Sequence, residues 1–309
     1  MAKPAHELSG RRGARSHVKP LIRPSWLPES VWPFQTFGIG VDDTMIAFTD
    51  VGDHDCPALL FVHTGMWSFI WRDVISRLAT DFRCIALDAP GTGQSSPMPA
   101  SSITLENSAR AVNGLIEGLE LENLTLVVHD LGGPAGLAGA ARTPERVRGI
   151  VAINAFGWKP AGALFRGMLA LMGSAPVREF DVMTGFIPRL TATNFGVGRH
   201  FDRASRDTFR AALGHDGRRA FHRYLNDARS CDELYARISS ALAGPFAKLP
   251  LLTIFGERND PLGFQPRWKQ IFPNARQLVV AKGNHFPMCD DPDLVANAIR
   301  TWHAEHVKS

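Results

Sequence analysis

Three side chains in this chain of 309 residues are spaced as a nucleophile, an acid and a base. Asp130 follows the apolar run Leu124–His129, and a glycine pair and a proline follow it within four residues. A buried strand that turns at once into a helix exposes the residue at the turn, the arrangement called a nucleophile elbow. Asp260 and His285 come later, each in a loop after an expected strand. Enzymes with a nucleophile elbow carry the nucleophile, the acid and the histidine in this same chain order.

Two points have alternatives: the role of the turn at Asp130 and the identity of the acid that orients the histidine. Asp stands where Ser is usual in an elbow, and Val128 stands where Gly is usual, so the turn could simply cap the next helix. For the acid we prefer Asp260 over Glu257, which lies nearer the end of its strand. Asp291 is expected to cap the final helix instead.

The segments that must position these residues alternate between strand and helix. Several expected strands are continuous apolar runs, as is typical of strands buried on both faces. The expected strands are Thr44–Asp50, Ala58–His63, Arg83–Asp88, Leu124–His129, Val147–Ile153, Leu249–Phe255 and Gln277–Ala281. The expected helices of this part are Leu105–Leu121, Pro134–Thr143 and Pro292–His306. This alternation predicts an α/β fold with a doubly wound, mostly parallel sheet, in which ligands bind at the carboxyl ends of the strands.

One long segment interrupts the alternation. Residues 156–245 contain no clear buried strand, and they are far too many for an ordinary strand-to-helix connection. Helical patterns fill this segment, at Ala161–Met172, Arg203–Leu213, Arg218–Ser230 and Leu234–Ala243. We therefore predict a helical cap domain at 156–245, inserted into a core domain formed by 25–155 and 246–309.

The net charge is concentrated at one end of the chain. There are 34 Lys and Arg against 30 Asp and Glu, a net charge of +4. Residues 1–23 hold six basic side chains and one acid, which gives +5 and leaves −1 for the rest. We predict a basic, disordered arm at 1–24. A nucleic-acid or membrane module would rest on this arm alone, so we expect no such partner.

Composition excludes several other classes. The chain is 45% hydrophobic and 21% charged, as is ordinary for a globular protein. The four cysteines form no C-x-x-C pair, so a zinc or dithiol site has no support, and we expect no metal and no cofactor. The arm lacks the apolar segment of a secretory signal, and no uncharged apolar run reaches 18 residues. We expect a cytoplasmic protein, monomeric or homodimeric.

Five short motifs together carry a family resemblance, which covers about residues 30–306 and is weakest in the cap. They are Phe61–His63, Trp67–Asp73, Phe82–Ser95, His129–Asp130 and Pro144–Val147. The chain resembles α/β-hydrolases of the haloalkane dehalogenase and epoxide hydrolase group, which use an Asp nucleophile. Some members carry a Glu after the strand that follows the elbow helix. Ala155 stands at that place here, and the resemblance therefore supports an acid after the next strand, at Asp260.

The resemblance implies a covalent mechanism. An aspartate nucleophile attacks a saturated or strained carbon and becomes an alkyl ester. His285 would then activate water against that ester, with Asp260 orienting the imidazole. The backbone N–H groups of Leu131 and Thr64 are the expected oxyanion hole.

Two halide donors of the family are replaced in this chain. Leu131 stands where haloalkane dehalogenases carry Trp, and Thr64 and its neighbours replace a motif whose Asn is the second donor. Trp67 could supply a new N–H donor, although ordinary core packing is the more usual role for such a residue. Tyr224 could protonate an epoxide oxygen, because it is one of only two tyrosines and both lie in the cap. Trp158 and Phe286 are expected to line an apolar pocket, with Phe156, Met168 and Met172.

Our leading expectation is a cofactor-free hydrolase that is haloalkane dehalogenase-like and acts on small apolar electrophiles and water. The alternatives are an epoxide hydrolase or a relative that opens β-lactones with loss of carbon dioxide. A non-catalytic small-molecule binder on the same fold is the alternative from another class. It has no need of Asp130, Asp260 and His285 together, which favours the enzyme.

Overall fold

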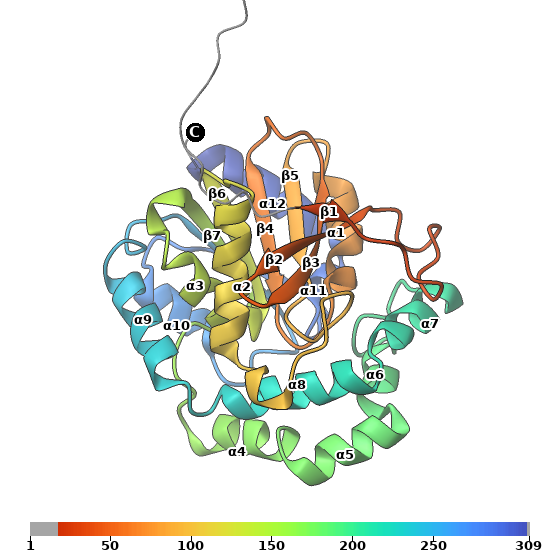
Figure 1. Ribbon diagram of the computed structural model, residues 1–309. Helices are drawn as coiled ribbons and strands as arrows, with labels where there is room; N and C mark the ends of the chain where they lie inside the picture. Colours follow the sequence, from red (N-terminus) through yellow and green to blue (C-terminus); the bar gives the residue numbers. More distant parts are fainter. Residues whose placement is uncertain (1–17, 308–309) are drawn as a thin grey trace, which may run out of the picture.

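The centre of the computed structural model, which describes residues 18–307, is a nine-stranded sheet (Figure 1). Its order is β1-β2-β3-β5-β4-β6-β7-β8-β9. The strands are β1 (Lys19–Pro20), β2 (Thr36–Val41), β3 (Thr44–Val51), β4 (Ala58–His63), β5 (Arg83–Leu87), β6 (Leu124–Asp130), β7 (Val147–Ala155), β8 (Leu251–Gly256) and β9 (Arg276–Val280). From β5 to β9 all neighbours pair in parallel, whereas the strands from β1 to β5 pair antiparallel along that edge.

Two separate hydrophobic cores cover the two faces of the sheet. In β4, Leu60 and Val62 belong to one core and Leu59 and Phe61 to the other, because successive strand residues point to opposite faces. The first core includes α2 (Leu105–Gly118), α3 (Gly132–Ala140), α9 (Asp232–Ala243) and α10 (Phe264–Ile271). The second includes α1 (Arg72–Leu78), α11 (Pro287–Asp290) and α12 (Pro292–His306). Burial on both faces explains why the central strands are continuous apolar runs.

The fold class predicted from the sequence is confirmed. All seven expected strands exist, with ends that differ by at most two residues from those expected. β1, β2 and α1 were not expected, since β1 has only two residues and β2 contains two glycines that weaken its apolar pattern. The arm expected at 1–24 lies mostly outside the described residues. Its last part is not an arm, because β1 pairs with β2.

Five helices between β7 and β8 form a separate layer, the cap. They are α4 (Ala163–Met172), α5 (Ala175–Thr184), α6 (Phe186–Thr191), α7 (Arg203–Ala212) and α8 (His215–Asp227). In Figure 1 they lie at the bottom and lower right, with α4 and α5 farthest from the sheet. The sixth helix of the insertion, α9, packs against α3 of the core. The predicted cap range of 156–245 therefore includes one helix that belongs to the core layer.

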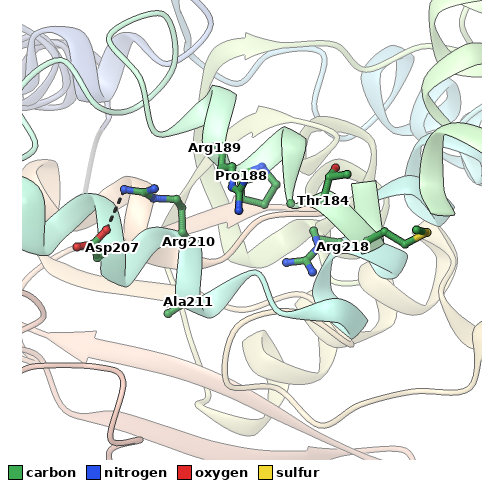
Figure 2. A pocket seen from close by; sticks show the side chains of 9 residues that line it. Thr184, Pro188, Arg189, Asp207, Arg210, Ala211 and Arg218 are labelled. Atoms are coloured by element: carbon green, nitrogen blue, oxygen red, sulfur yellow. Dashed lines mark hydrogen bonds and ion pairs between the residues drawn. The ribbon is translucent and has the colours of Figure 1, made fainter. Parts of the chain in front are cut away.

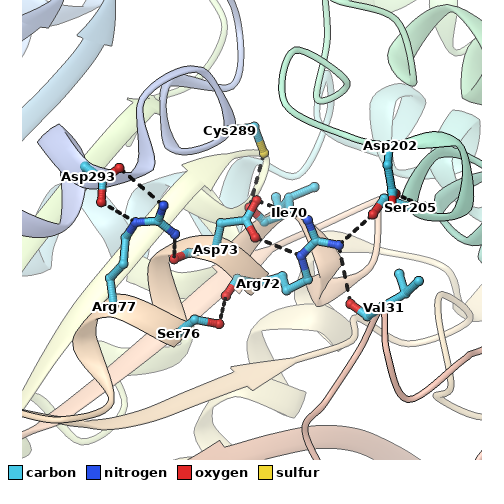
Figure 3. A network of polar contacts seen from close by, with 10 residues as sticks. All are labelled: Val31, Ile70, Arg72, Asp73, Ser76, Arg77, Asp202, Ser205, Cys289 and Asp293. Atoms are coloured by element: carbon cyan, nitrogen blue, oxygen red, sulfur yellow. Dashed lines mark hydrogen bonds and ion pairs between the residues drawn. The ribbon is translucent and has the colours of Figure 1, made fainter.

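Arg72 is one of several side chains that join the cap to the core (Figure 3). Arg72 in α1 donates hydrogen bonds to the carbonyl of Val31 at 3.3 Å and to the hydroxyl of Ser205 in α7 at 2.9 Å. It also pairs with Asp73 at 2.8 Å, and its guanidinium stacks 5.0 Å from the ring centre of Phe201. Three segments far apart in the sequence thus meet at one cation.

Within residues 18–307, no helix is both long and apolar enough to cross a membrane.

Two buried histidines lie side by side where β4 and β6 end. His63 and His129 are paired in the parallel register, and their rings stack with centres 5.0 Å apart. Burial, with a smaller contribution from the charge of His285, lowers the pKa of His63 to about 3. Burial also lowers the pKa of His129 well below its usual value. Both imidazoles are therefore neutral in the folded protein at ordinary pH.

We expect these histidines to make the fold sensitive to acid. Between pH 6.5 and 3 the unfolded chain takes up protons that the folded protein does not, so the free energy of unfolding falls as the pH drops. Each such histidine contributes about 1.4 kcal/mol per pH unit. Urea denaturation at pH 7, 6 and 5 should show a shallower pH dependence for His63→Gln than for the wild type. The exposed His215→Gln is the control and should keep the wild-type dependence. An unchanged slope in His63→Gln would contradict this account.

Candidate active site

Asp130 occupies a strained turn between β6 and α3. Its φ of 50° lies in the left-handed region, which is costly for a residue with a side chain. A Cβ atom on Gly132 would lie 2.1 Å from the carbonyl oxygen of Val62, and one on Gly133 would lie 2.2 Å from that of Phe156. Both positions therefore exclude any larger residue. The start of α3 packs directly against the backbone of Val62 and Phe156, and this holds Asp130 at the end of β6.

His285 faces Asp130 across the carboxyl end of the sheet. Its Nε2 lies 3.4 Å from Oδ2 of Asp130, and the two side chains are 35% and 26% exposed. Burial alone would raise the pKa of the Asp130 carboxyl. The hydrogen bond and charge of His285, with the N–H of Leu131, outweigh burial and hold that pKa below its usual value. The structure thus brings together an ionised carboxylate and an imidazole that both remain accessible.

Side chains from two central strands hold the loop that carries His285. His129 at the end of β6 donates from Nε2 to the His285 carbonyl at 2.8 Å, and Asn154 in β7 donates to the same oxygen at 2.9 Å. The ring of Phe286 lies 5.0 Å from that of His129 and 4.8 Å from that of His285, measured between centroids. The imidazole is therefore fixed by buried groups of the core.

The side chain that meets the other nitrogen of His285 is Asn259, not Asp260. The Asn259 amide lies 3.1 Å from Nδ1. Both carboxylate oxygens of Asp260 instead accept backbone N–H groups at the start of α10, from Phe264 at 2.6 Å and Gln265 at 2.9 Å. This geometry corrects the expected role of Asp260 as the orienting acid, because capping α10 uses its carboxylate. The runner-up Glu257 accepts the N–H of Lys282 at 2.7 Å, so neither acid meets the imidazole.

An amide in this place has different chemistry from a carboxylate. Asn259 offers both a donor and an acceptor, so it can hold either tautomer of neutral His285. The structure has the amide nitrogen of Asn259 at Nδ1, which places the proton of neutral His285 on Nε2, toward Asp130. With the amide turned over, its oxygen accepts from Nδ1–H and the lone pair of Nε2 is free to act as a base. It brings no negative charge, so it orients the ring without the extra stabilisation of an imidazolium that a carboxylate gives.

The two expected oxyanion positions adjoin the turn. Leu131 donates its backbone N–H to the carboxylate of Asp130. Thr64 follows β4 directly, and the register that pairs His63 with His129 places it beside Asp130 at the same edge. The Thr64 side chain is fully buried, and its hydroxyl lies 3.1 Å from that of Ser108.

Two of the aromatic residues expected at the substrate site, Trp67 and Trp158, are buried in packing clusters. Trp67 is fully buried in an aromatic cluster, stacked on Phe69 at 4.8 Å between ring centres and 5.6 Å from Trp32. The core-packing role matches this placement better than a halide donor does. Trp158 is also buried, and the guanidinium of Arg267 lies 4.3 Å above its ring. Of the expected pocket residues, Phe286 is the one whose ring contacts that of His285.

Tyr224 does not reach the site with its hydroxyl. The hydroxyl is buried and donates to the carbonyl of Pro90 at 2.7 Å, and burial raises the pKa of the phenol. Tyr235 donates in the same way to the carbonyl of Ala228 at 2.9 Å. Each phenol proton is thus engaged by backbone, so the structure corrects the expected role of Tyr224 as an acid at the site.

Four residues at the site were missed by the sequence reasoning: His63, His129, Asn154 and Asn259. His63 and His129 end neighbouring parallel strands, so the same rule that located His285 could have found them. Asn259 directly precedes Asp260, the residue that we predicted as the acid, and no pattern distinguishes two adjacent polar residues in a loop.

Among the described residues, no three His, Cys, Asp or Glu side chains are arranged to hold a metal ion.

Comparisons with known proteins agree with this fold. Residues 57–292 match the family described as alpha/beta hydrolase fold. Haloalkane dehalogenase 2 of Mycobacterium tuberculosis is 26% identical over 275 residues, covering 87% of this chain and 95% of the relative. Cis-3-alkyl-4-alkyloxetan-2-one decarboxylase of Shewanella oneidensis is 27% identical over 294 residues, covering 90% and 91%.

Solved structures show the same fold. The crystal structure of the putative ancestral haloalkane dehalogenase AncHLD2 has a TM-score of 0.74 and 24% identity, and the match covers 87% of this chain and 98% of that one. The family match extends from β4 to the start of α12 and includes Asp130 and His285. The chain therefore belongs to the alpha/beta hydrolase fold family, and its distant relatives make it haloalkane dehalogenase-like.

Proposed function

We propose that this protein is a hydrolase that forms a covalent ester on Asp130 with a small apolar electrophile. The observation that carries the proposal is the contact of 3.4 Å between His285 and the Asp130 carboxylate at a strained strand-to-helix turn. A carboxylate nucleophile with an adjacent imidazole base is the arrangement that covalent catalysis requires. The haloalkane dehalogenase among the relatives makes a carbon–halogen bond the first substrate to test.

The reaction has two steps. An oxygen of Asp130 attacks the substrate carbon, and the leaving group departs with the electrons of its bond. His285 then takes a proton from water, and the water oxygen attacks the carbonyl carbon of the new ester. The N–H groups of Leu131 and Thr64 stabilise the oxyanion, which collapses to release an alcohol and free Asp130. Asn259 orients the imidazole during the second step.

The second candidate is the opening of a β-lactone ring. Leu131 brings an apolar side chain to the position after the nucleophile, and the indole of Trp67 lies in a core cluster, so no donor for a departing halide is evident there. Attack on the ring carbon of a β-lactone releases a carboxylate, which needs no proton donor to leave. A relative that acts on such oxetanones covers 90% of this chain. An epoxide is less well supported, because its alkoxide needs a proton and both tyrosines donate to backbone.

The covalent step is tested with His285→Gln. The variant should still be alkylated but should not hydrolyse the ester, so substrate mass accumulates on the peptide that contains Asp130. Intact and peptide mass spectrometry after incubation with a bromoalkane, an epoxide and a β-lactone, each in turn, would also identify the leaving group. Asp130→Asn is the matched control and should gain no mass. A substrate that the wild type turns over, but that leaves no adduct on His285→Gln, would refute the mechanism.

The assignment of Asn259 as a positioning residue makes a separate prediction. Asn259→Ala should slow ester hydrolysis by roughly tenfold or more, because His285 loses its orientation, while the alkylation step changes little. Asn259→Asp should restore the hydrolysis rate and change its pH profile, because a carboxylate also stabilises the imidazolium. Single-turnover kinetics separate the two steps.

Asp260→Ala provides the contrast. It removes the cap of α10 and should lower the free energy of unfolding by about 1 kcal/mol, with the hydrolysis rate and pH profile of the remaining folded enzyme unchanged. If Asp260→Ala instead abolishes hydrolysis while Asn259→Ala leaves it intact, Asp260 is the orienting acid after all.

A further inference from the structure

The outer face of the cap exposes a concentration of large apolar side chains. Of the twelve exposed large hydrophobic residues in the described part of the chain, eight lie between 164 and 195. In α4, Phe165 and Leu169 form the buried stripe, while Leu164, Met168 and Leu171 form a second stripe that is 45–71% exposed. A helix that is apolar on both faces is expected to be covered on both. Among residues 18–307, nothing covers the outer stripe.

The exposed apolar surface continues onto α5 and α6. Phe180 and Met183 in α5 are 57% and 82% exposed, and Phe186 and Leu190 in α6 are each 49% exposed. The rings of Phe180 and Phe186 lie 6.2 Å apart between centres, so they form one patch. Figure 1 shows α4 and α5 as the outermost helices of the cap. Apolar patches of this kind on a soluble fold mark interaction sites.

A cationic pocket adjoins this patch (Figure 2). The pocket, of about 400 Å³, lies between α5, α6 and α7, and Met183 of the patch forms part of its wall, with Arg189, Arg210 and Arg218. Figure 2 shows Arg210 turned toward Asp207, with which it pairs at 2.8 Å. Nη1 of Arg218 and Nε of Arg189 both lie within 4 Å of the point where a Cβ on Gly185 would be, and neither residue pairs with a carboxylate among residues 18–307. Arg218 donates to the backbone carbonyls of Leu213 at 2.6 Å and Val182 at 2.8 Å, so its charge faces the pocket while its terminal nitrogens hold the backbone.

Two guanidinium charges that line one pocket without a carboxylate partner favour an anion there. Like charges repel, and a phosphate, which accepts paired N–H donors from an arginine such as Arg189, relieves the repulsion. The cap as a whole is basic, since residues 156–245 contain thirteen Lys and Arg against eight Asp and Glu. The apolar patch and the cationic pocket together match one kind of ligand, an amphiphile with an anionic headgroup.

We propose that this face of the cap docks on a membrane surface that contains anionic phospholipid. A headgroup phosphate binds Arg189 in this pocket, where the charge of Arg218 also attracts it, and the exposed side chains of α4, α5 and α6 enter the boundary between headgroups and acyl chains. Interfacial helices bind in this way, through buried apolar area and attraction to acidic lipids. The docking is peripheral and does not depend on the proposed function.

The charge of the surface argues against a second copy of the chain as the occupant. In a twofold dimer the same patch faces itself, which would bring the arginines of one pocket against those of the other.

A second cavity lies on the inner side of this pocket. This smaller cavity shares Pro188 and Arg218 with the pocket and reaches Gly65 and Met66, in the loop that contains Thr64. Pro188 and Arg218 thus lie between the docking face and the loop beside the Asp130 turn.

The test measures binding of the full-length protein to vesicles. We expect it to cosediment with vesicles of equal phosphatidylglycerol and phosphatidylcholine, and much less with phosphatidylcholine alone. Met183→Ser with Phe186→Ser, and separately Arg189→Glu, should each weaken binding at least about fivefold. Val279→Ser with Arg276→Glu makes the same kinds of change on the exposed strand β9 and should bind like the wild type. Circular dichroism checks that each variant is folded.

Three results would overturn the proposal. The first is equal binding by the wild type and both cap variants, which would assign any lipid affinity to another part of the chain, such as its basic N-terminal residues. The second is no cosedimentation of the wild type, even where calorimetry shows that inorganic phosphate binds. The third is concentration-dependent dimerisation in analytical ultracentrifugation that the cap substitutions abolish, which would make a second copy the occupant.

Discussion

The contact between Asp130 and His285 depends on one strained backbone position. Asp130 has a left-handed φ, and such a conformation persists only where the surroundings enforce it. The enforcement comes from Gly132 and Gly133, whose missing side chains let α3 approach Val62 and Phe156. The sheet supplies the rest, because parallel pairing places the ends of β4, β6 and β7 side by side and buried groups from them hold the His285 loop. The site is thus a property of the core, and the cap is added to it.

The parts of the fold that the sequence predicted well are those in which one physical requirement decides the structure. Strands buried on both faces must be apolar throughout, so β4 was located to the residue and the other six expected strands to within two residues. Asp130 and His285 follow such strands, and topology alone brings their loops to one edge of the sheet. The parts that failed depend on side-chain direction in loops. Asn259 and Asp260 are adjacent, and only the start of α10 decides which of them turns toward Nδ1 of His285.

The same distinction applies to the aromatic residues of the site. The rarity of tyrosine suggested a role for Tyr224 at the substrate, and the missing halide donors suggested Trp67, but Tyr224 donates to backbone and Trp67 packs in a core cluster. The cap was predicted as helical, yet its exposed apolar face could not be seen in the sequence. In α4 the buried and exposed stripes have the same composition, and only the packing on α8 shows which one is covered. The positive charge of the cap could not be seen either, because it cancels the negative charge of the core in the net charge of the residues after the arm.

The Arg72 link has a consequence for turnover. The cap covers the sheet, so any motion that widens the entrance by lifting α7 must pull Ser205 and Phe201 away from one guanidinium group that also holds Val31. The same motion breaks the pairing of Arg199 with Asp290 at 3.1 Å and the contact of His200 with the Asp290 carbonyl at 3.0 Å, because both residues adjoin Phe201 in the sequence. Exchange of substrate and product through this side of the cap then requires several polar contacts to be released. Through Arg72, the segment before β2 is coupled to a cap more than 130 residues later in the sequence.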